Sequence, residues 1–182
     1  VLLDQYALFG RREAISPKSA LTASAIETVC QCAPDSVPAR IAHKHAAAFD
    51  MIGARVKLLP AHGDLSAQNV FVCGGQPWII DWDTAGSPQP LLYDVFYLVL
   101  REAELGRPDL LQAILDGVLD AELDRMYAAC DLSARPCDNL VLLVHSYMIH
   151  FHTIKCAGKR DATRHNLELL WNRLQQHCVG YL

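Results

Sequence analysis

Residues 62–73 read HGDLSAQNVFVC, and residues 78–83 read WIIDWD. Two apolar runs rich in β-branched and aromatic residues lie on either side of Gly74 and Gly75, which form a strong turn signal. This pattern predicts a β-hairpin from Val70 to Ile80. A hairpin returns the chain to where it began, so the residues just after position 80 should lie beside the residues just before position 70.

Three oxygen-bearing side chains flank the predicted hairpin. Asp64 and Asn69 stand at the two ends of one short polar loop, and Asp81 follows the second apolar run. We expect the three to converge, because the hairpin brings both flanks together. Carboxylate and carboxamide oxygens suit a hard cation, Mg²⁺ above all, with substrate phosphates completing its coordination. Asp64 would then be free to hold a substrate hydroxyl and accept its proton.

Each of these residues also has an ordinary structural interpretation. Asp64 can be a turn or helix-cap residue, Asn69 can end a turn, and Asp81 can be a solvated strand end. The order and spacing of the three, taken together, favour a functional site. Asp83 can join a second metal or stay solvated, and the sequence leans towards solvation.

The composite pattern resembles the aminoglycoside phosphotransferase and choline kinase group of the protein-kinase-like superfamily. The match consists of HGDxxxxN at 62–69, the hydrophobic hairpin, and Ile-Asp-Trp at 80–82. The continuation at 85–88 and 93–95 is also similar. The motifs span roughly residues 60–98, and this ordered combination is far more specific than any one of its parts.

The resemblance implies an ATP- and Mg²⁺-dependent phosphotransferase that moves the γ-phosphate to a hydroxyl of a small molecule, such as an aminoglycoside-like alcohol. It makes Asp64 the catalytic base, and Asn69 and Asp81 the ligands of the Mg²⁺ that bridges the ATP phosphates. Structural support falls to three further residues, with the last of them bracing the loop: His62, Gly63 and Asp94.

The expected fold class is α+β and mostly helical, a kinase-like C-terminal lobe spanning residues 1–182 with one small hairpin at the metal site. It divides into leading helices (1–57), the catalytic loop, hairpin and metal loop (58–90), and a helical substrate-side subdomain (91–182). Pro88 and Pro90 predict irregular structure up to about Leu91. Apolar residues at helical spacing predict seven helices, at 20–33, 38–57, 92–105, 109–116, 118–130, 139–156 and 161–179.

A kinase of this type also needs an N-terminal lobe with a phosphate-covering loop. Residues before Leu58 look helical, no G-x-G-x-x-G occurs, and the chain begins with Val1. We therefore expect that lobe to be missing from this chain, and to be supplied in cis or by another chain.

Two other functions stay open. One is a non-catalytic kinase-like binding module, and the other, ranked last, is a phosphohydrolase that uses Asp81 and Asp83.

Composition excludes several other classes of protein. The chain of 182 residues is 52% hydrophobic and 20% charged with a net charge of −4, which excludes disorder and argues against a nucleic-acid partner. No apolar stretch is long enough to span a membrane. The seven cysteines are an odd number and cannot all pair within one chain, so a reducing cytoplasm is the expected location.

Two weaker patterns remain. Residues 101–131 carry eight acidic residues against three arginines, a net charge of −5. Acidic helices in the resembling family suit polycationic aminoglycosides, but a solvated helix face explains the same charges.

Two pairs of histidines are separated by one residue, at 43 and 45 and at 150 and 152. On a helix this spacing points the two rings of each pair in different directions. They therefore predict packed or solvated histidines, not metal ligands.

Overall fold

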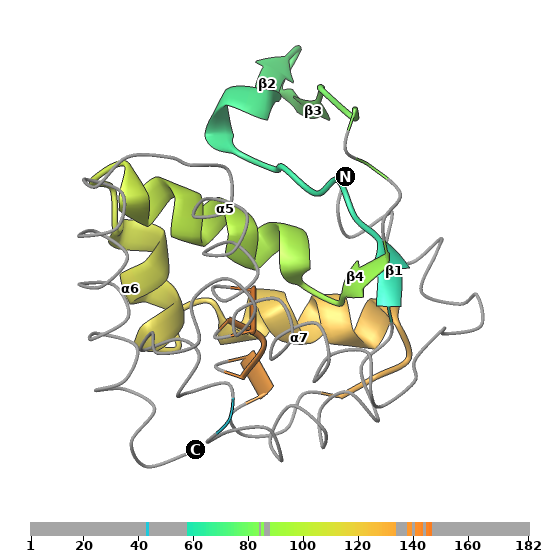
Figure 1. Cartoon of the computed structure of the whole chain (residues 1–182), viewed down its shortest axis with the longest axis vertical. Coiled ribbons are helices and arrows are strands. Elements are labelled where there is room, and N and C mark those ends of the chain that lie inside the picture. The colour runs from blue at the N-terminus through green and yellow to red at the C-terminus, as the bar shows by residue number, and fades with distance from the viewer. Residues whose placement is uncertain are drawn as a thin grey trace. The chain divides into compact units, whose positions relative to one another are not determined.

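The computed structural model describes residues 43, 58–83, 85, 88–133, 138, 139, 141–143, 145 and 146. The chain forms two compact units, the first made of Val1–Ile15 and Val56–Arg135 and the second of Ser16–Arg55 and Pro136–Leu182. The strands and helices labelled in Figure 1 belong to the first unit.

The described part of the second unit is short. His43 is helical and exposed, and residues 141–143 are helical and buried. The predicted helices at 20–33 and 161–179 lie outside the described residues, as does most of those at 38–57 and 139–156.

A two-stranded antiparallel sheet lies where the sequence predicted irregular structure. β1 (Leu58–Pro60) pairs with β4 (Pro88–Pro90), and Leu59 stands opposite Gln89. The prediction drawn from the prolines was therefore wrong, and the fold has a second small sheet. The fixed φ of proline is compatible with an extended strand, and a two-stranded sheet leaves every strand an outer edge where a missing N–H is tolerated. In this register Pro60, which precedes the 61–69 loop, stands opposite Pro88, and Pro90, which is separated from the next helix by two residues, stands opposite Leu58.

The predicted hairpin is confirmed. β2 (Val70–Cys73) and β3 (Gln76–Ile79) pair antiparallel. Gly74 and Gly75 form the turn with φ values of 58° and 77°. Both turn residues are thus left-handed, as a tight two-residue hairpin requires, and glycine adopts this conformation without steric cost.

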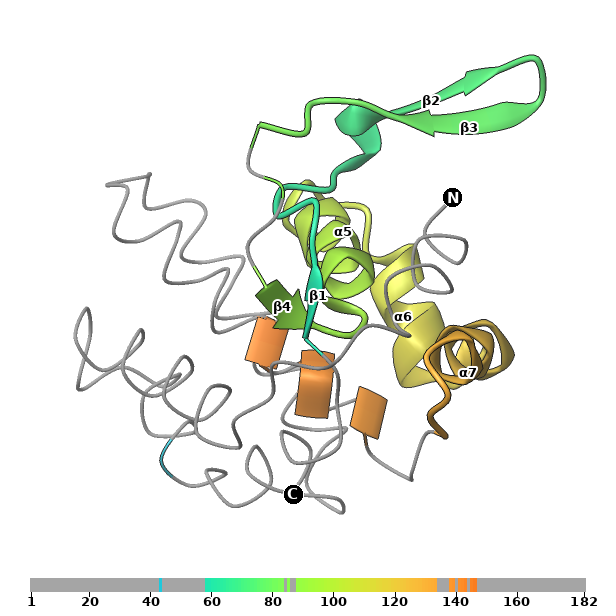
Figure 2. The same ribbon diagram turned by 90° about the vertical axis from the view of Figure 1, so that its right-hand side faces the viewer.

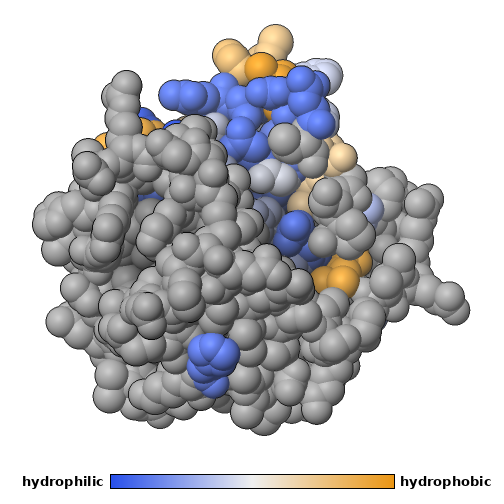
Figure 3. Space-filling view, in the orientation of Figure 1, coloured by the Kyte–Doolittle hydropathy of each residue, from blue (hydrophilic) through white to orange (hydrophobic). Residues whose placement is uncertain are grey.

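The hairpin is an exposed arm that extends away from the helices (Figure 2). Phe71, Val72 and Trp78 are 53%, 74% and 60% exposed. Hydrophobic atoms at the top of Figure 3 lie beside hydrophilic ones in this region. The strand pair is consequently not part of the core, and its function must lie in what it places at its base and along its surface.

Three helices follow the second sheet. They are α5 (Tyr93–Glu104), α6 (Asp109–Leu115) and α7 (Asp120–Ala129), which confirms the helices predicted at 92–105, 109–116 and 118–130. The third begins two residues later than predicted.

Within the part of the chain that the structure describes, no helix has both the length and the apolar character needed to cross a bilayer. Side chains from these helices and from the 61–69 loop form a shared core, including Leu65, Phe96, Leu100, Leu111 and Leu123.

Ion pairs neutralise part of the acidic 101–131 segment. Arg107 makes a bidentate pair with the buried Glu102, with Nε 2.8 Å from Oε2 and Nη2 3.1 Å from Oε1. Nη1 of Arg101 lies 2.9 Å from Oε2 of the buried Glu104. These carboxylates serve the packing of α5 and the α5–α6 turn, so they are not available to a cationic ligand.

Leu92 gives a test of how α5 begins. This residue immediately precedes the helix with a φ of 70° and is fully buried. Leucine in the left-handed region costs about 1–2 kcal/mol, whereas glycine is not strained there. Leu92→Ala should lower the free energy of unfolding by about 2–5 kcal/mol. Leu92→Gly should be at least as stable as the alanine variant.

The matched control is Leu100, which is equally buried but lies within α5. There the usual order should hold, with alanine more stable than glycine by about 1 kcal/mol. Urea denaturation of the four variants measures both differences. The same order at the two positions would show that the left-handed start of α5 is not strained.

Candidate functional site

The first turn of α5 holds the loop that carries Asp64. Asp94, which is 4% exposed, accepts two backbone hydrogen bonds. The N–H of His62 donates to its Oδ2 (2.9 Å) and the N–H of Gly63 donates to its Oδ1 (3.0 Å). Burial raises the pKa of Asp94, and these two N–H donors act in the opposite direction by favouring the ionised form. Through these two hydrogen bonds Asp94 connects the backbone of His62 and Gly63 to the first turn of α5.

Gly63 and His62 have different parts in this loop. Gly63 has a φ of 87°, a conformation that glycine adopts freely. The ring of His62 is buried, with Nε2 2.8 Å from the carbonyl oxygen of Ile80 and Nδ1 3.4 Å from the backbone nitrogen of Asp64. A backbone N–H can only donate, so Nδ1 is the acceptor and Nε2 carries the proton that it donates to Ile80. His62 therefore links the loop to the end of the hairpin.

Asn69 makes a second link between the loop and the hairpin. Its Nδ2 donates to the backbone oxygen of Asp64 (3.0 Å), and its own backbone oxygen accepts the N–H of Ile80 (3.0 Å). Because a carbonyl oxygen can only accept, the amide nitrogen must face Asp64, and the planar amide then directs Oδ1 to the opposite side. Oδ1 is the atom of Asn69 that a hard cation would use.

Asp81 follows Ile80 in an unusual backbone conformation. It is exposed and has a φ of 61°, which non-glycine residues seldom adopt, although aspartate tolerates it better than most. Nε1 of Trp82 donates to the carbonyl oxygen of Ile79 (2.9 Å), and the Trp82 ring packs against the His62 ring with centroids 4.7 Å apart. These contacts hold the backbone on both sides of Asp81. Strained residues held in this way cluster at functional sites.

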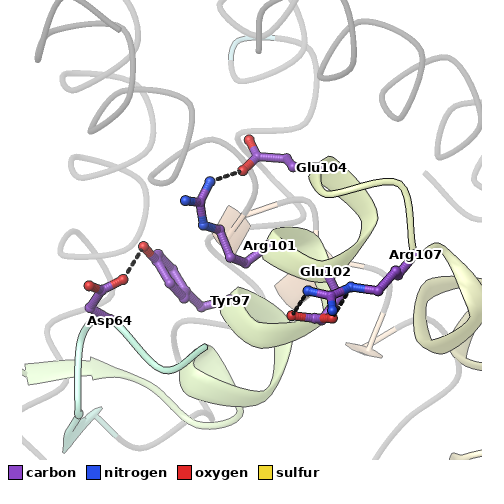
Figure 4. A network of polar contacts seen from close by, with 6 residues as sticks. All are labelled: Asp64, Tyr97, Arg101, Glu102, Glu104 and Arg107. Carbon is purple, nitrogen blue, oxygen red and sulfur yellow. Dashed lines mark hydrogen bonds and ion pairs between the residues drawn. The ribbon is translucent and has the colours of Figure 1, made fainter. Parts of the chain in front are cut away.

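Tyr97 contacts the carboxylate of Asp64 directly. Asp64 is an exposed residue, and its Oδ1 accepts a hydrogen bond from the hydroxyl of the buried Tyr97 (2.6 Å; Figure 4). Burial raises the pKa of Tyr97 and the hydrogen bond to Asp64 raises it further, so the phenol stays protonated at neutral pH and is the donor. Tyr97 follows Asp94 by three residues, which puts both on one face of α5.

Sequence reasoning missed Tyr97 as a member of the site, because an aromatic residue at helical spacing usually packs in a core. The signal that was present is Asp94-x-x-Tyr97, a polar residue and an aromatic hydroxyl one turn apart at the start of a helix. Trp82 and the backbone of Ile80 were also missed as supporting groups. Trp82 and Ile80 contribute through contacts with other segments of the chain, and no pattern of neighbouring residues predicts such contacts.

Two side chains at the base of the hairpin are of types that a divalent cation takes as ligands. Asn69 and Asp81 supply an amide oxygen and an exposed carboxylate, both suited to Mg²⁺. Among the described residues there is no group of three or more His, Cys, Asp or Glu side chains that could hold a metal. Mg²⁺ commonly takes one or two carboxylates together with waters and substrate phosphates, so an amide oxygen and one carboxylate would be only part of its ligand set. Asp83 is exposed.

We predict that Asp94→Asn will loosen the loop. Asparagine offers one acceptor oxygen and turns an N–H₂ group towards the second backbone N–H, which is left without a partner at a cost of about 1–3 kcal/mol. The free energy of unfolding should fall by that amount, and the amide protons of His62 and Gly63 should exchange faster in NMR hydrogen exchange.

The control for this substitution is Asp109→Asn, in the first turn of α6, where the residue is exposed. That variant loses a similar helix-dipole interaction without removing an acceptor from the loop. Unchanged exchange at positions 62 and 63 in the Asp94→Asn protein would contradict the bracing role.

The comparisons with known proteins agree with this geometry. The sequence model of the phosphotransferase enzyme family, abbreviated APH, matches residues 15–132, which is more than half of the chain. The matched range contains the loop, the hairpin and α5. Neither the search of curated proteins nor the search of solved structures found a match. The resemblance inferred from HGDxxxxN and Ile-Asp-Trp is confirmed, and the chain belongs to the APH phosphotransferase enzyme family.

Proposed function

We propose that this chain carries the catalytic loop and the metal ligands of an ATP- and Mg²⁺-dependent phosphotransferase, which moves the γ-phosphate of ATP to a hydroxyl of a small molecule. Family membership establishes a phosphotransferase in general terms. The nucleotide, the metal, the acceptor and the residue roles belong to the proposal.

The observation that carries the proposal is the double link made by Asn69. Its side chain holds the backbone of Asp64, and its carbonyl oxygen holds the N–H of Ile80, the residue before Asp81. One residue thereby ties the candidate base to the segment that carries the second candidate ligand. Groups that must act together on one phosphoryl group have to be held in a fixed relation, because catalysis of this kind depends mostly on positioning and electrostatics.

In the proposed reaction the acceptor oxygen forms a bond to the γ-phosphorus, and the bond from that phosphorus to the β–γ bridging oxygen breaks. The acceptor proton goes to the carboxylate of Asp64, and ADP leaves. Oδ1 of Asn69 and the carboxylate of Asp81 would hold Mg²⁺, which when bound neutralises charge on the phosphates. Asp94, His62 and Gly63 support the loop without touching substrate.

The proposal also requires a lobe that covers the nucleotide, in cis or from another chain. The β2–β3 arm offers apolar surface next to the site, with Phe71, Val72 and Trp78 all more than half exposed. Apolar surface of this kind suits contact with a nucleotide base or with another protein segment. ATP as the phosphate donor favours the cytoplasm as the location, and the proposal involves neither a nucleic acid nor a membrane.

The acceptor proposed is a small alcohol or an aminoglycoside-like molecule. Once Glu102 and Glu104 are assigned to their arginines, the 101–131 segment still presents exposed carboxylates that can attract a polycation. They lie on or next to α6 and α7, at Asp109, Asp116, Asp120, Asp124 and Asp131.

Two substitutions separate the proposed roles. In the whole encoded protein, assayed with Mg·ATP against aminoglycosides and amino alcohols such as kanamycin and choline, Asp64→Asn should lower kcat by about 10²- to 10⁴-fold with an unchanged Mg²⁺ requirement, because it removes a general base. Asp81→Asn should instead raise the Mg²⁺ concentration that gives half-maximal activity, because it removes a charged ligand.

Glu122→Gln is the control and should keep its kcat, because this exposed residue of α7 is paired with Arg125 and is not one of the carboxylates proposed to attract the acceptor. Wild-type kcat in the Asp64→Asn protein would refute the base. A wild-type Mg²⁺ requirement after Asp81→Asn would refute the ligand. A wild-type protein that neither turns over nor is stabilised thermally by Mg·ATP would favour the non-catalytic module.

A further inference from the structure

The hydrogen bond between Tyr97 and Asp64 joins a protonated phenol to a carboxylate. The hydroxyl oxygen of Tyr97 lies 2.6 Å from Oδ1 of Asp64, within the range of about 2.5–2.7 Å that is typical of an O–H donor on an ionised acceptor. Figure 4 shows the ring of Tyr97 directed from α5 at one oxygen of Asp64, with the second oxygen turned away from it. Among the described residues, Oδ1 is the only oxygen of this carboxylate for which a hydrogen bond is found.

We infer that Tyr97 is a positioning residue for phosphoryl transfer, whose hydroxyl holds Oδ1 of Asp64 so that Oδ2 is the oxygen that receives the acceptor proton. The inference rests on the proposed function and deepens it by naming the reacting atom. During the transfer the acceptor proton moves to Oδ2 as the acceptor oxygen binds the γ-phosphorus and the β–γ bridging oxygen leaves with ADP. Tyr97 keeps its own proton throughout.

The need for this contact follows from the flexibility of an aspartate on a loop. Asp94 accepts hydrogen bonds from the backbone of His62 and Gly63, which orders the chain before Asp64 but leaves the rotation of the Asp64 side chain free. Tyr97 restricts that rotation from the next turn of the same helix. A base must lie within hydrogen-bonding distance of the proton that it accepts, and small misplacements of reacting groups reduce rates strongly.

A purely structural explanation is that a buried tyrosine simply needs a partner for its hydroxyl. Burial raises the pKa of Tyr97, as does the hydrogen bond to Asp64, and both explanations agree on a neutral donor. They differ in what happens when the hydroxyl is removed. A structural role predicts a change in stability alone, whereas a positioning role predicts slower chemistry with unaltered binding.

The test is Tyr97→Phe in the whole encoded protein, with Tyr93→Phe as the matched control. Tyr93 is a buried tyrosine one turn earlier in α5, and its ring centroid is 6.0 Å from that of Tyr97. Tyr97→Phe should lower kcat by about 10- to 100-fold, the value expected for losing a hydrogen bond to a charged group. The KM values for Mg·ATP and for the acceptor should not change. Tyr93→Phe should keep its kcat.

A double-mutant cycle shows whether Tyr97 acts through Asp64. In an Asp64→Asn background, Tyr97→Phe should cause little further loss of kcat, because the carboxylate that it holds is already gone. An equal loss in both backgrounds would overturn the inference, as would a change confined to KM or to thermal stability. If Asp64→Asn itself leaves kcat intact, the proposed function fails. If Asp64→Asn is inactive and Tyr97→Phe is fully active, only the present inference fails.

Two readouts do not depend on knowing the acceptor. Hydrolysis of Mg·ATP uses water in place of the alcohol, so the same pattern of kcat values should appear there. In ¹³C NMR, the Asp64 carboxylate carbon should shift in the Tyr97→Phe protein and stay in place in the Tyr93→Phe protein. An unmoved signal in the Tyr97→Phe protein would show that the hydrogen bond is not formed in solution and would overturn the inference.

Discussion

The rest of the site depends on the two hydrogen bonds that the carboxylate of Asp94 accepts. This carboxylate accepts the backbone N–H groups of His62 and Gly63 and so joins the loop to the first turn of α5, although the two segments lie about thirty residues apart in the chain. Burial raises its pKa, which is the expected effect of removing a charge from water, and the two N–H donors partly offset that effect. A helix start is also a favourable place for a negative charge. With the loop fixed to α5, Tyr97 can reach Asp64 from the following turn.

Ile80 has the corresponding role on the other side of the site. Both of its backbone polar groups are used by the loop, since its N–H donates to Asn69 and its carbonyl oxygen accepts from Nε2 of His62. The chain therefore leaves the hairpin along a fixed path, and Asp81 takes its left-handed conformation at the next residue. Strain of this kind, of order 1–3 kcal/mol, persists only where neighbouring contacts hold the backbone, as the contacts of Ile80 and Trp82 do here.

The carboxylates near the site differ in burial and in whether they have hydrogen-bonding or ionic partners. Three buried carboxylates among the described residues of the first unit are matched by donors: Asp94 by two backbone N–H groups, Glu102 by Arg107 and Glu104 by Arg101. Asp64 and Asp81 are exposed. Exposed carboxylates next to a hairpin base can exchange protons and ligands with solvent or substrate, whereas matched and buried ones serve to keep the structure in place.

Local patterns were enough to predict the hairpin, because the turn chemistry of Gly74 and Gly75 acts over a few residues. They were also enough for α5, α6 and α7, whose apolar spacing repeats over several turns. The family was recognisable because HGDxxxxN and Ile-Asp-Trp occur in order at a fixed spacing. The roles assigned to Asp64, Asn69 and Asp81 remain predictions, although the contacts of Asn69 now connect the segments that carry them.

The sequence by itself determined the β2–β3 hairpin, the helices α5, α6 and α7, the family and the candidate residues, since each of these is encoded in short runs of neighbouring residues. Only the tertiary structure decided that Pro88–Pro90 pairs with Leu58–Pro60, that Ile80 is held from two sides, and that Tyr97 contacts Asp64. Each of these contacts joins residues that are distant in the chain. Their geometry depends on how the helix and the loop pack, and a pattern of neighbouring residues does not contain that information.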